Sequence, residues 1–308
     1  MSLSRRALLV VAAGSVLAGC QKARENGDRG AATAVPPGPA SATTAPAPAT
    51  TPPAISAASP APAETPAPTA AGPRPGRAEV VARYGGVAPE EWGLEVSRVI
   101  TGLPGGERTT ALTFDACGGP GGNGYDADLI DFLRAHDVPA TLFLNARWID
   151  ANPAEFDRLA ADPLFEIGNH GSVHRPLSVR GRSAYGIAGT RDVGEVYDEV
   201  ADNAEKLTGL LGHPPGFFRS GTAHYDDIAT RIVADLGERV AGFTVNGDGG
   251  ATLGASEVRR EVTTAPPGAI VIAHMNHPGG GTAPGIAAAV PALLASGRRF
   301  VRLSEALG

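Results

Sequence analysis

Short apolar runs alternate with longer amphipathic stretches from about residue 79 to the end of this 308-residue chain. A short apolar run predicts a buried strand, and apolar residues that recur three or four positions apart predict a helix with one face in the core. Strands and helices that alternate in this way form a parallel sheet covered by helices. About seven such units within about 230 residues favour an α/β fold closed into a barrel over an open sheet.

The same patterns predict where individual elements lie. The run 110–114 is expected to be a buried strand, and the stretch 126–136 carries Leu129, Ile130 and Leu133 on one helical face. Further strands are expected at 140–144, 165–167, 216–218, 240–245, 269–273 and 299–303, and further helices at about 153–161 and 193–211.

The first third of the chain has a different composition. Residues from about 31 to 75 are nearly all Ala, Pro, Thr, Ser and Gly, which offer almost no apolar bulk to bury, so we expect a disordered tether over residues 20–78. The rest of the chain, residues 79–308, is expected to form one globular domain. Its lack of a basic cluster and the net charge of −6 argue against nucleic acid as a partner, and we expect a monomer.

Residues 1–19 have the features of an export signal. Arg5 and Arg6 precede the apolar run 7–17, which is too short to span a bilayer, and the run ends in a segment that resembles the bacterial lipobox before Cys20. We therefore expect a lipoprotein signal peptide and lipidation of Cys20. An ordinary cleavage site with an incidental cysteine is the alternative. Gln21 after the cysteine favours the outer membrane if the source has two membranes, and the export route stays open.

Polar residues of unusual type follow the expected strands directly. They come from five separate segments: Asp115, His170 (after Asn169), Arg219, Asp248 and His274. In a parallel barrel the carboxyl ends of the strands converge on one face. The sequence therefore predicts one mouth that carries two carboxylates, a guanidinium and at least two imidazoles.

His170 and His174 are candidate metal ligands. Their spacing would direct both rings the same way on one helical turn, and imidazoles suit a transition-metal ion. With seven histidines in the chain such a pair also arises by chance, and two capping histidines in a loop are the alternative. Their position directly after a strand favours the metal site.

Asp115 and His274 are candidates for acid–base chemistry. Asp115 lies between a strand and the glycine-rich run 118–122, where a carboxylate can bind metal or take a proton from water. His274 follows an apolar strand and can protonate a leaving group, and Arg219 can hold Asp115 ionised. The alternatives are a turn aspartate, a core histidine and a surface ion pair.

Five segments of the chain together form an ordered set of motifs, namely 113–115, 169–174, 218–221, Asp248 and 272–274. Their order and spacing over residues 108–307 resemble the polysaccharide deacetylases, the NodB-homology domain of carbohydrate esterase family 4. The resemblance implies an incomplete (β/α)7 barrel of the TIM type. It also implies a divalent metal, commonly zinc with cobalt or nickel as alternatives, and hydrolysis of an N-acetyl or O-acetyl group on a sugar.

The resemblance also implies roles for the individual residues. Asp115 would be the catalytic base and His274 the general acid, Arg219 would orient Asp115, and Asp248 would hold His274. His170 and His174 would be metal ligands. Tyr225, Gly221 and Asn246 would bind the substrate, with a backbone N–H near Tyr225 stabilising the oxyanion.

The sequence departs from the family pattern at three places. Ala116 replaces the second aspartate of the first motif, which completes the metal site in the family, and the usual proline–tyrosine pair and tryptophan of later motifs are missing. A remodelled pocket follows. The candidates for the third ligand are Cys117, Asp126, Asp128, Asp115 and His277. Cys117 ranks low among them, because the side chain at position 116 is expected to face the metal.

Three functions follow from these observations. The first is a metal-dependent deacetylase of a cell-envelope or secreted glycan, exported and anchored by lipid. The second is hydrolysis of another amide bond, including a cyclic one. The third is a glycan-binding lipoprotein without catalytic activity, in which loss of the second aspartate abolished metal binding.

Overall fold

The computed structural model describes residues 74–105 and 108–308, all of which lie in one compact unit, Ala67–Gly308. Cys20, the expected signal peptide and nearly all of the expected tether lie outside the described residues. The first described helix, α1, spans Arg77–Tyr84, so it begins two residues before the expected domain start at residue 79.

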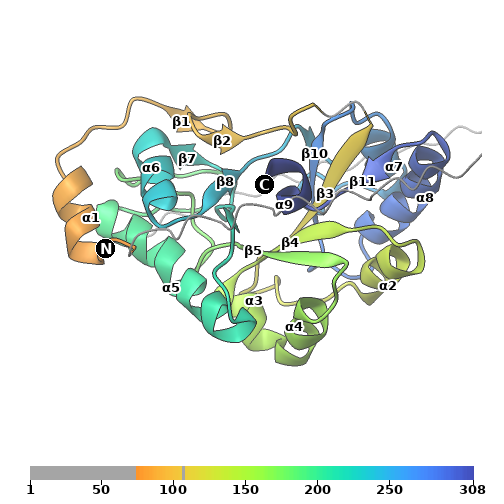
Figure 1. Cartoon of the computed structure of the whole chain (residues 1–308), viewed down its shortest axis with the longest axis horizontal. Helices are drawn as coiled ribbons and strands as arrows, with labels where there is room; N and C mark the ends of the chain where they lie inside the picture. Colours follow the sequence, from red (N-terminus) through yellow and green to blue (C-terminus); the bar gives the residue numbers. More distant parts are fainter. Residues whose placement is uncertain (1–73, 106–107) are drawn as a thin grey trace, which may run out of the picture. The chain divides into compact units, whose positions relative to one another are not determined.

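A parallel sheet forms the centre of the domain, in the strand order β2-β8-β6-β5-β4-β3-β10-β9, with β11 beside β3 (Figure 1). The strands are β2 (Val99–Ile100), β3 (Thr109–Ala116), β4 (Ala140–Leu144), β5 (Phe165–Asn169), β6 (Phe217–Phe218), β8 (Arg239–Ala241), β9 (Val245–Asn246), β10 (Ile270–His274) and β11 (Arg299–Phe300). This sheet is the expected incomplete TIM-like barrel of an α/β protein.

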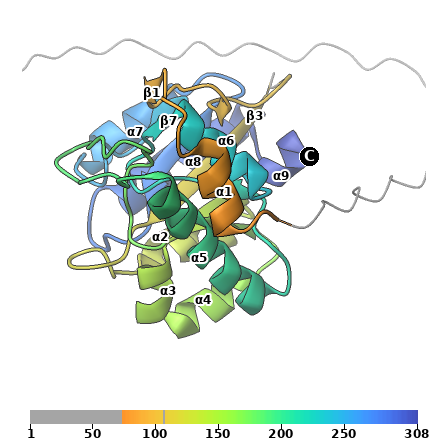
Figure 2. The same ribbon diagram turned by 90° about the vertical axis from the view of Figure 1, so that its left-hand side faces the viewer.

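Helices surround the sheet (Figures 1 and 2). In addition to α1 they are α2 (Ala127–Ala135), α3 (Ala146–Ala151), α4 (Pro153–Ala160), α5 (Val193–Leu211), α6 (Asp227–Asp235), α7 (Ala255–Thr263), α8 (Thr282–Ala295) and α9 (Leu303–Leu307). The carboxylates of Asp126, Asp192 and Asp226 accept backbone N–H groups in the first turns of α2, α5 and α6. Such N-caps satisfy donors that a helix end leaves free.

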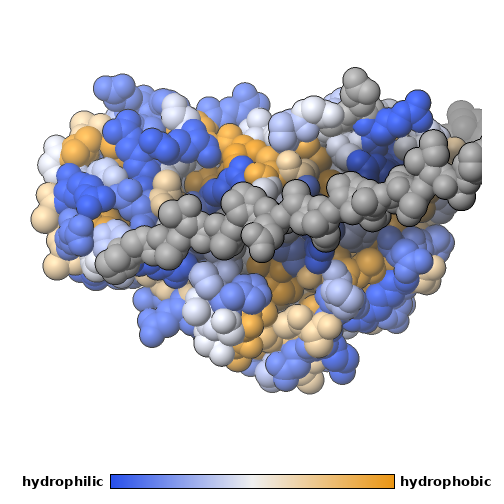
Figure 3. All heavy atoms as spheres, viewed as in Figure 1, coloured by the Kyte–Doolittle hydropathy of each residue, from blue (hydrophilic) through white to orange (hydrophobic). Residues whose placement is uncertain are grey.

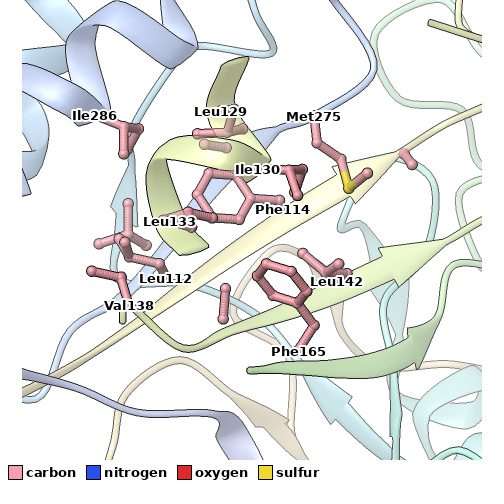
Figure 4. Packing of buried hydrophobic residues seen from close by; sticks show 14 of the residues in the cluster. Leu112, Phe114, Leu129, Ile130, Leu133, Val138, Leu142, Phe165, Met275 and Ile286 are labelled. Atoms are coloured by element: carbon pink, nitrogen blue, oxygen red, sulfur yellow. The ribbon is translucent and has the colours of Figure 1, made fainter. Parts of the chain in front are cut away.

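Side chains along β3 alternate between two environments. Leu112, Phe114 and Ala116 are buried in the hydrophobic cluster between the sheet and the helices, where Phe114 lies beside α2 (Figure 4). Thr113 and Asp115 occupy the opposite face, because successive side chains of a strand point to opposite sides. The side chains on the helix-facing side of β3 thus pack in the core, and the opposite side of the strand can carry polar residues.

The segment before β3 runs across the domain, from α1 beside α5 to β2 at one edge of the sheet (Figures 1 and 2). Helix α1 packs against α5, with Arg77 paired to Asp198 at 2.6 Å. Strand β1 (Trp92–Gly93) then pairs antiparallel with β7 (Tyr225–Asp226), and β2 adds to the sheet beside β8.

Two expected strands differ in the structure. The expected strand 240–245 is two short strands, β8 and β9, which pair with different neighbours. The chain crosses between them: Gly242 N–H donates to Ile100 on one side, and Thr244 N–H donates to Ile270 on the other. The expected strand 299–303 is limited to β11, after which α9 begins.

No helix in the described part of the chain is long and apolar enough to cross a membrane. On the face seen in Figure 3, hydrophilic residues cover much of the outer rim, and hydrophobic residues gather toward the middle.

Candidate active site

The carboxyl ends of the central strands meet at one pocket of about 260 Å³, which Asp115 and His274 line together. These two residues are register partners on the neighbouring strands β3 and β10. Arg219 follows β6, His170 follows β5, and Asp248 follows β9. The structure therefore brings together the five polar residues that follow strands in the sequence.

Arg219 is fully buried and fixes Asp115. Its Nη1 donates to Asp115 Oδ1 at 2.8 Å and to Thr113 Oγ1 at 2.9 Å, and its other nitrogens donate to backbone carbonyls of β8 and Gly242. Burial by itself raises the pKa of Asp115, but the charge of Arg219, helped by His170 and His274, outweighs it and lowers the pKa below its usual value. Asp115 is therefore a carboxylate at neutral pH.

His170 has one ring nitrogen engaged and the other facing the site. Its Nδ1 lies 2.9 Å from the backbone oxygen of Arg219, which requires an N–H there. The Nε2 then carries the lone pair, 3.8 Å from the Sγ of Cys117 and 3.7 Å from Asp115. A backbone carbonyl that fixes the tautomer in this way is typical of histidines that bind metal.

His174 follows in an irregular loop and not on a helical turn, so the spacing alone does not align the two rings. Gly171 and His174 both have left-handed backbone, with φ of 76° and 65°. The buried carboxylate of Glu199 shapes this loop, because it accepts the backbone N–H of Val173 at 3.1 Å and of Arg175 at 3.2 Å. The two imidazole rings nevertheless meet, with centroids 5.0 Å apart.

The Nε2 of His174 is buried and has no hydrogen-bond partner among the described residues. An unpaired buried polar atom is costly, so it calls for a ligand. Gly221 makes room for this ring: a Cβ at position 221 would lie 2.5 Å from His174 Cγ. The loop and the glycine together place a free imidazole nitrogen beside His170.

Cys117 completes the group, which reverses its low rank among the third-ligand candidates. Donor atoms of Cys117, His170 and His174 all lie within 4.8 Å of one another. The expectation that residue 116 faces the metal is wrong, because β3 continues through Ala116 and buries that side chain in the helix-side core. Position 117 then falls on the same side of the chain as Asp115.

The remaining candidates for a third ligand lie elsewhere. Asp126 caps α2, accepting the Leu129 N–H at 3.2 Å. Asp128 and His277 are exposed. Asp115 is engaged by Arg219, although its other oxygen faces His170. Within the ranges that the structure describes, Cys117, His170 and His174 form the cluster best arranged for a metal ion.

His274 and Asp248 form a second pair, in which the Asp248 side chain is fully buried and the His274 side chain is 14% exposed. The Nδ1 of His274 lies 3.0 Å from Asp248 Oδ1, and its backbone N–H donates to Oδ2 at 2.7 Å. Thr282 Oγ1 donates to the same carboxylate at 2.9 Å. Burial lowers the pKa of His274, but Asp248 and then Cys117 raise it well above its usual value. The imidazole is therefore held as a proton donor.

The three expected substrate-binding residues separate in the structure. Gly221 and Asn246 line the pocket. The side chain of Tyr225 does not, because it is fully buried and its hydroxyl accepts the Ser220 N–H at 3.0 Å. The pocket is instead lined by the aromatic residues Phe243 and Tyr185, of which Tyr185 is 76% exposed. Its only signal in the sequence is a Tyr–Gly pair in a polar stretch that lacks apolar periodicity.

Residues 102–241 match the family model described as polysaccharide deacetylase. The chain is 29% identical to a chitooligosaccharide deacetylase of Bradyrhizobium sp. (strain ANU 289) over 182 residues, which cover 57% of this chain and 74% of the relative.

Two solved structures share the fold. A pseudoenzyme of family CE4 from Bacillus anthracis superposes with a TM-score of 0.58 at 21% identity, over 70% of each chain. PdaA of Bacillus subtilis, a family 4 carbohydrate esterase, gives a TM-score of 0.56 at 21% identity, over 68% of this chain and 85% of its own. The chain is thus similar to polysaccharide deacetylases over residues 102–241, and it shares the fold of family 4 carbohydrate esterases.

Proposed function

We propose that the protein is a metal-dependent deacetylase that removes acetyl groups from N- or O-acetylated sugars of a cell-envelope or secreted polysaccharide. One observation carries this proposal: the Cys117, His170 and His174 group lies beside Asp115, whose register partner on the neighbouring strand is His274. The named activity of the Bradyrhizobium relative supports the substrate class.

The donor set fits zinc. A thiolate and two imidazoles are soft and borderline ligands, which zinc prefers and which magnesium and calcium avoid, while cobalt or nickel are acceptable substitutes. Three protein ligands that leave one position open are typical of catalytic zinc sites. A metal held there would supply Lewis acidity, which polarises the acetyl carbonyl and lowers the pKa of water.

Asp115 is the base in the proposed reaction. Its ionised carboxylate, fixed by Arg219, takes the proton from the attacking water as the new C–O bond forms to the acetyl carbon. Arg219 does not compete for substrate, because its nitrogens are engaged by Asp115, Thr113 and backbone carbonyls.

His274 is the acid. It donates its proton to the sugar nitrogen, or to the oxygen of an ester, as the bond to the acetyl carbon breaks. The products are acetate and the free amine or hydroxyl. Asp248 holds the imidazole at both its Nδ1 and its backbone N–H, so the remaining Nε2 is available to the pocket.

Metal content and turnover together test the proposal. Purified protein should retain about one zinc per chain after dialysis and release acetate from N-acetylglucosamine oligomers. Chelation should stop the release, and zinc or cobalt should restore it. Protein that takes up none of these metals and stays inert with them would contradict both hydrolase functions and favour a glycan-binding lipoprotein without catalytic activity. Turnover of cyclic amides but not of acetylated sugars would favour a hydrolase of another amide bond.

The proposed place of action is the cell envelope, with lipid at Cys20 and a tether that lets the domain reach a polymer. The lipobox-like sequence and the composition of residues 20–78 support it. Cys20→Ala should abolish labelling by a palmitate analogue and release the protein from the membrane fraction. Equal labelling of the variant would contradict lipidation at this residue.

A further inference from the structure

Three aromatic side chains form a row that continues outward from the pocket. Tyr185 meets the His224 ring edge-on with centroids 5.1 Å apart, and His224 lies 5.9 Å from Trp92. Tyr185 and Thr222 line the pocket, and His224 follows two residues after Thr222. The row therefore begins at the pocket wall and leads to β1. We call these three residues the aromatic row.

Tyr185 is held outward at some conformational cost. It has a left-handed backbone, with φ of 51°, in a two-residue turn with Gly186, where Ala184 and Ile187 exchange backbone hydrogen bonds of 3.1 and 2.9 Å. A non-glycine residue in this conformation costs on the order of 1 kcal/mol. The ring is 76% exposed and so recovers little of this by packing. A contact with an external ligand accounts for such a residue.

The rings of Trp92 and His224 are held in place by contacts with the rest of the protein. Trp92 belongs to β1, whose pairing with β7 places it opposite Asp226. The Arg182 guanidinium lies 5.0 Å from the centre of its ring. The Nδ1 of His224 lies 2.8 Å from the backbone oxygen of Thr222. A rigid aromatic surface of this kind binds ligands with little loss of side-chain freedom.

The pocket itself is small. Its volume of about 260 Å³ is at the lower end for sites that bind organic ligands, so it suits one sugar residue and not a chain. A polymer bound there must continue over the protein surface. Aromatic faces suit this continuation, because they pack against the apolar C–H face of a pyranose while Arg182 can donate hydrogen bonds to its hydroxyl groups.

We propose that Tyr185, His224 and Trp92 form a second sugar-binding subsite, which holds the neighbouring residue of a glycan whose acetylated residue occupies the pocket. The proposal rests on the proposed function and narrows its substrate to chains of at least two pyranose rings. Trp92 lies outside residues 102–241, so this subsite depends on the segment that precedes the family-matched region.

Sugar binding to a variant without catalytic activity tests the subsite separately from catalysis. In an Asp115→Asn background, calorimetry with an N-acetylglucosamine tetramer and with the monosaccharide should show tighter binding of the tetramer. Trp92→Ala should weaken the tetramer about tenfold, about 1.4 kcal/mol, and leave the monosaccharide unchanged. Tyr185→Ala should also weaken the tetramer, and Tyr185→Phe should restore it because the ring is retained.

Fluorescence gives a second readout. The chain has two tryptophans, and Trp148 is fully buried, so a sugar on the aromatic row should change the emission of Trp92 alone. The change should vanish in Trp92→Phe. Tyr185 is exposed, so Tyr185→Ala keeps the test valid if Trp92 variants fold poorly.

The outcomes are distinguishable. Equal tetramer affinity with and without the Trp92 and Tyr185 rings would overturn the subsite alone. A protein that binds neither sugar would overturn the subsite together with the proposed function. Tetramer binding that depends on the row in a protein that never releases acetate would uphold the subsite and contradict the deacetylase.

Discussion

The Sγ of Cys117 lies 3.8 Å from the Nε2 of His170, and that nitrogen lies 3.7 Å from the Oδ2 of Asp115. The closeness follows from the length of β3, which carries the chain through Ala116 and returns the next side chain to the inner face. Ala116, which follows Asp115, thus packs in the core, and the thiol of Cys117 lies beside the imidazoles. This relationship sets the expected metal chemistry.

Cys117→Ala should weaken zinc binding by roughly two orders of magnitude, because one of three protein ligands is lost. In cobalt-loaded protein, the near-ultraviolet band of a sulfur–cobalt bond should be present in the wild type and absent in this variant. Cys20→Ala is the matched control, since Cys20 is the other cysteine of the chain. Retention of the band in Cys117→Ala would exclude Cys117 as a ligand.

Asp115→Asn should lower kcat by about 10²- to 10⁴-fold with metal content unchanged, because the amide fills the same space but cannot take the proton from water. Arg219 would then be left with a neutral partner in a buried place, so the melting temperature should fall as well. Metal analysis and acetate release on the same preparation check this prediction. Full activity would remove Asp115 from the role of base.

His274→Ala should slow hydrolysis of N-acetyl sugars strongly while metal stays bound. A nitrophenyl acetate should suffer much less, since its leaving group departs without being protonated. Asp248→Asn should show the same pattern more weakly, because the imidazole stays but loses the carboxylate that holds it at 3.0 Å. Equal losses on both substrates would contradict the assignment of His274 as the acid.

Glu238 should make the domain less stable as pH rises. Burial raises its pKa to about 8, and the hydrogen bond from Asn169 offsets this only in part. The unfolded chain releases the proton near the ordinary value of 4.5, so between the two values the folded state holds the extra proton. Stability should therefore fall toward pH 8, by up to about 1.4 kcal/mol per pH unit, and level off above it.

Urea unfolding at a series of pH values checks this effect. Glu238→Gln keeps the hydrogen-bonding shape without the charge, and should flatten the dependence. Glu205→Gln on the exposed side of α5 serves as the control and should leave the dependence unchanged. A Glu238→Gln profile that matches the wild type would show that this carboxyl does not govern the slope.

Gly221→Ala should reduce metal affinity, because its Cβ would lie 2.5 Å from His174 Cγ and displace the ring. Gly209→Ala is a matched control in α5, where a Cβ meets nothing within 4 Å. That change should raise stability by about 1 kcal/mol through helix propensity and leave metal binding intact. Zinc titration of both variants checks the pair, and unaltered affinity in Gly221→Ala would contradict the packing argument.

The sequence by itself determined the α/β class, the position of the longer elements and the residues at the strand ends. The strand 140–144 and the helix 193–211 have the same bounds in the structure as in the sequence patterns. Both are long enough for their apolar residues to reveal a period. Polar residues directly after such strands are visible for the same reason.

The tertiary structure alone decided how these residues meet. Two-residue strands such as β6 and β9 are too short to show alternation, so only pairing with distant neighbours defines them. The direction in which the Cys117 side chain points depends on where β3 ends. The end of β3 is set by its pairing with β4 and by its packing in the helix-side core. The aromatic row joins segments far apart in the chain. Local sequence patterns cannot specify contacts of this kind, because they arise from packing between elements.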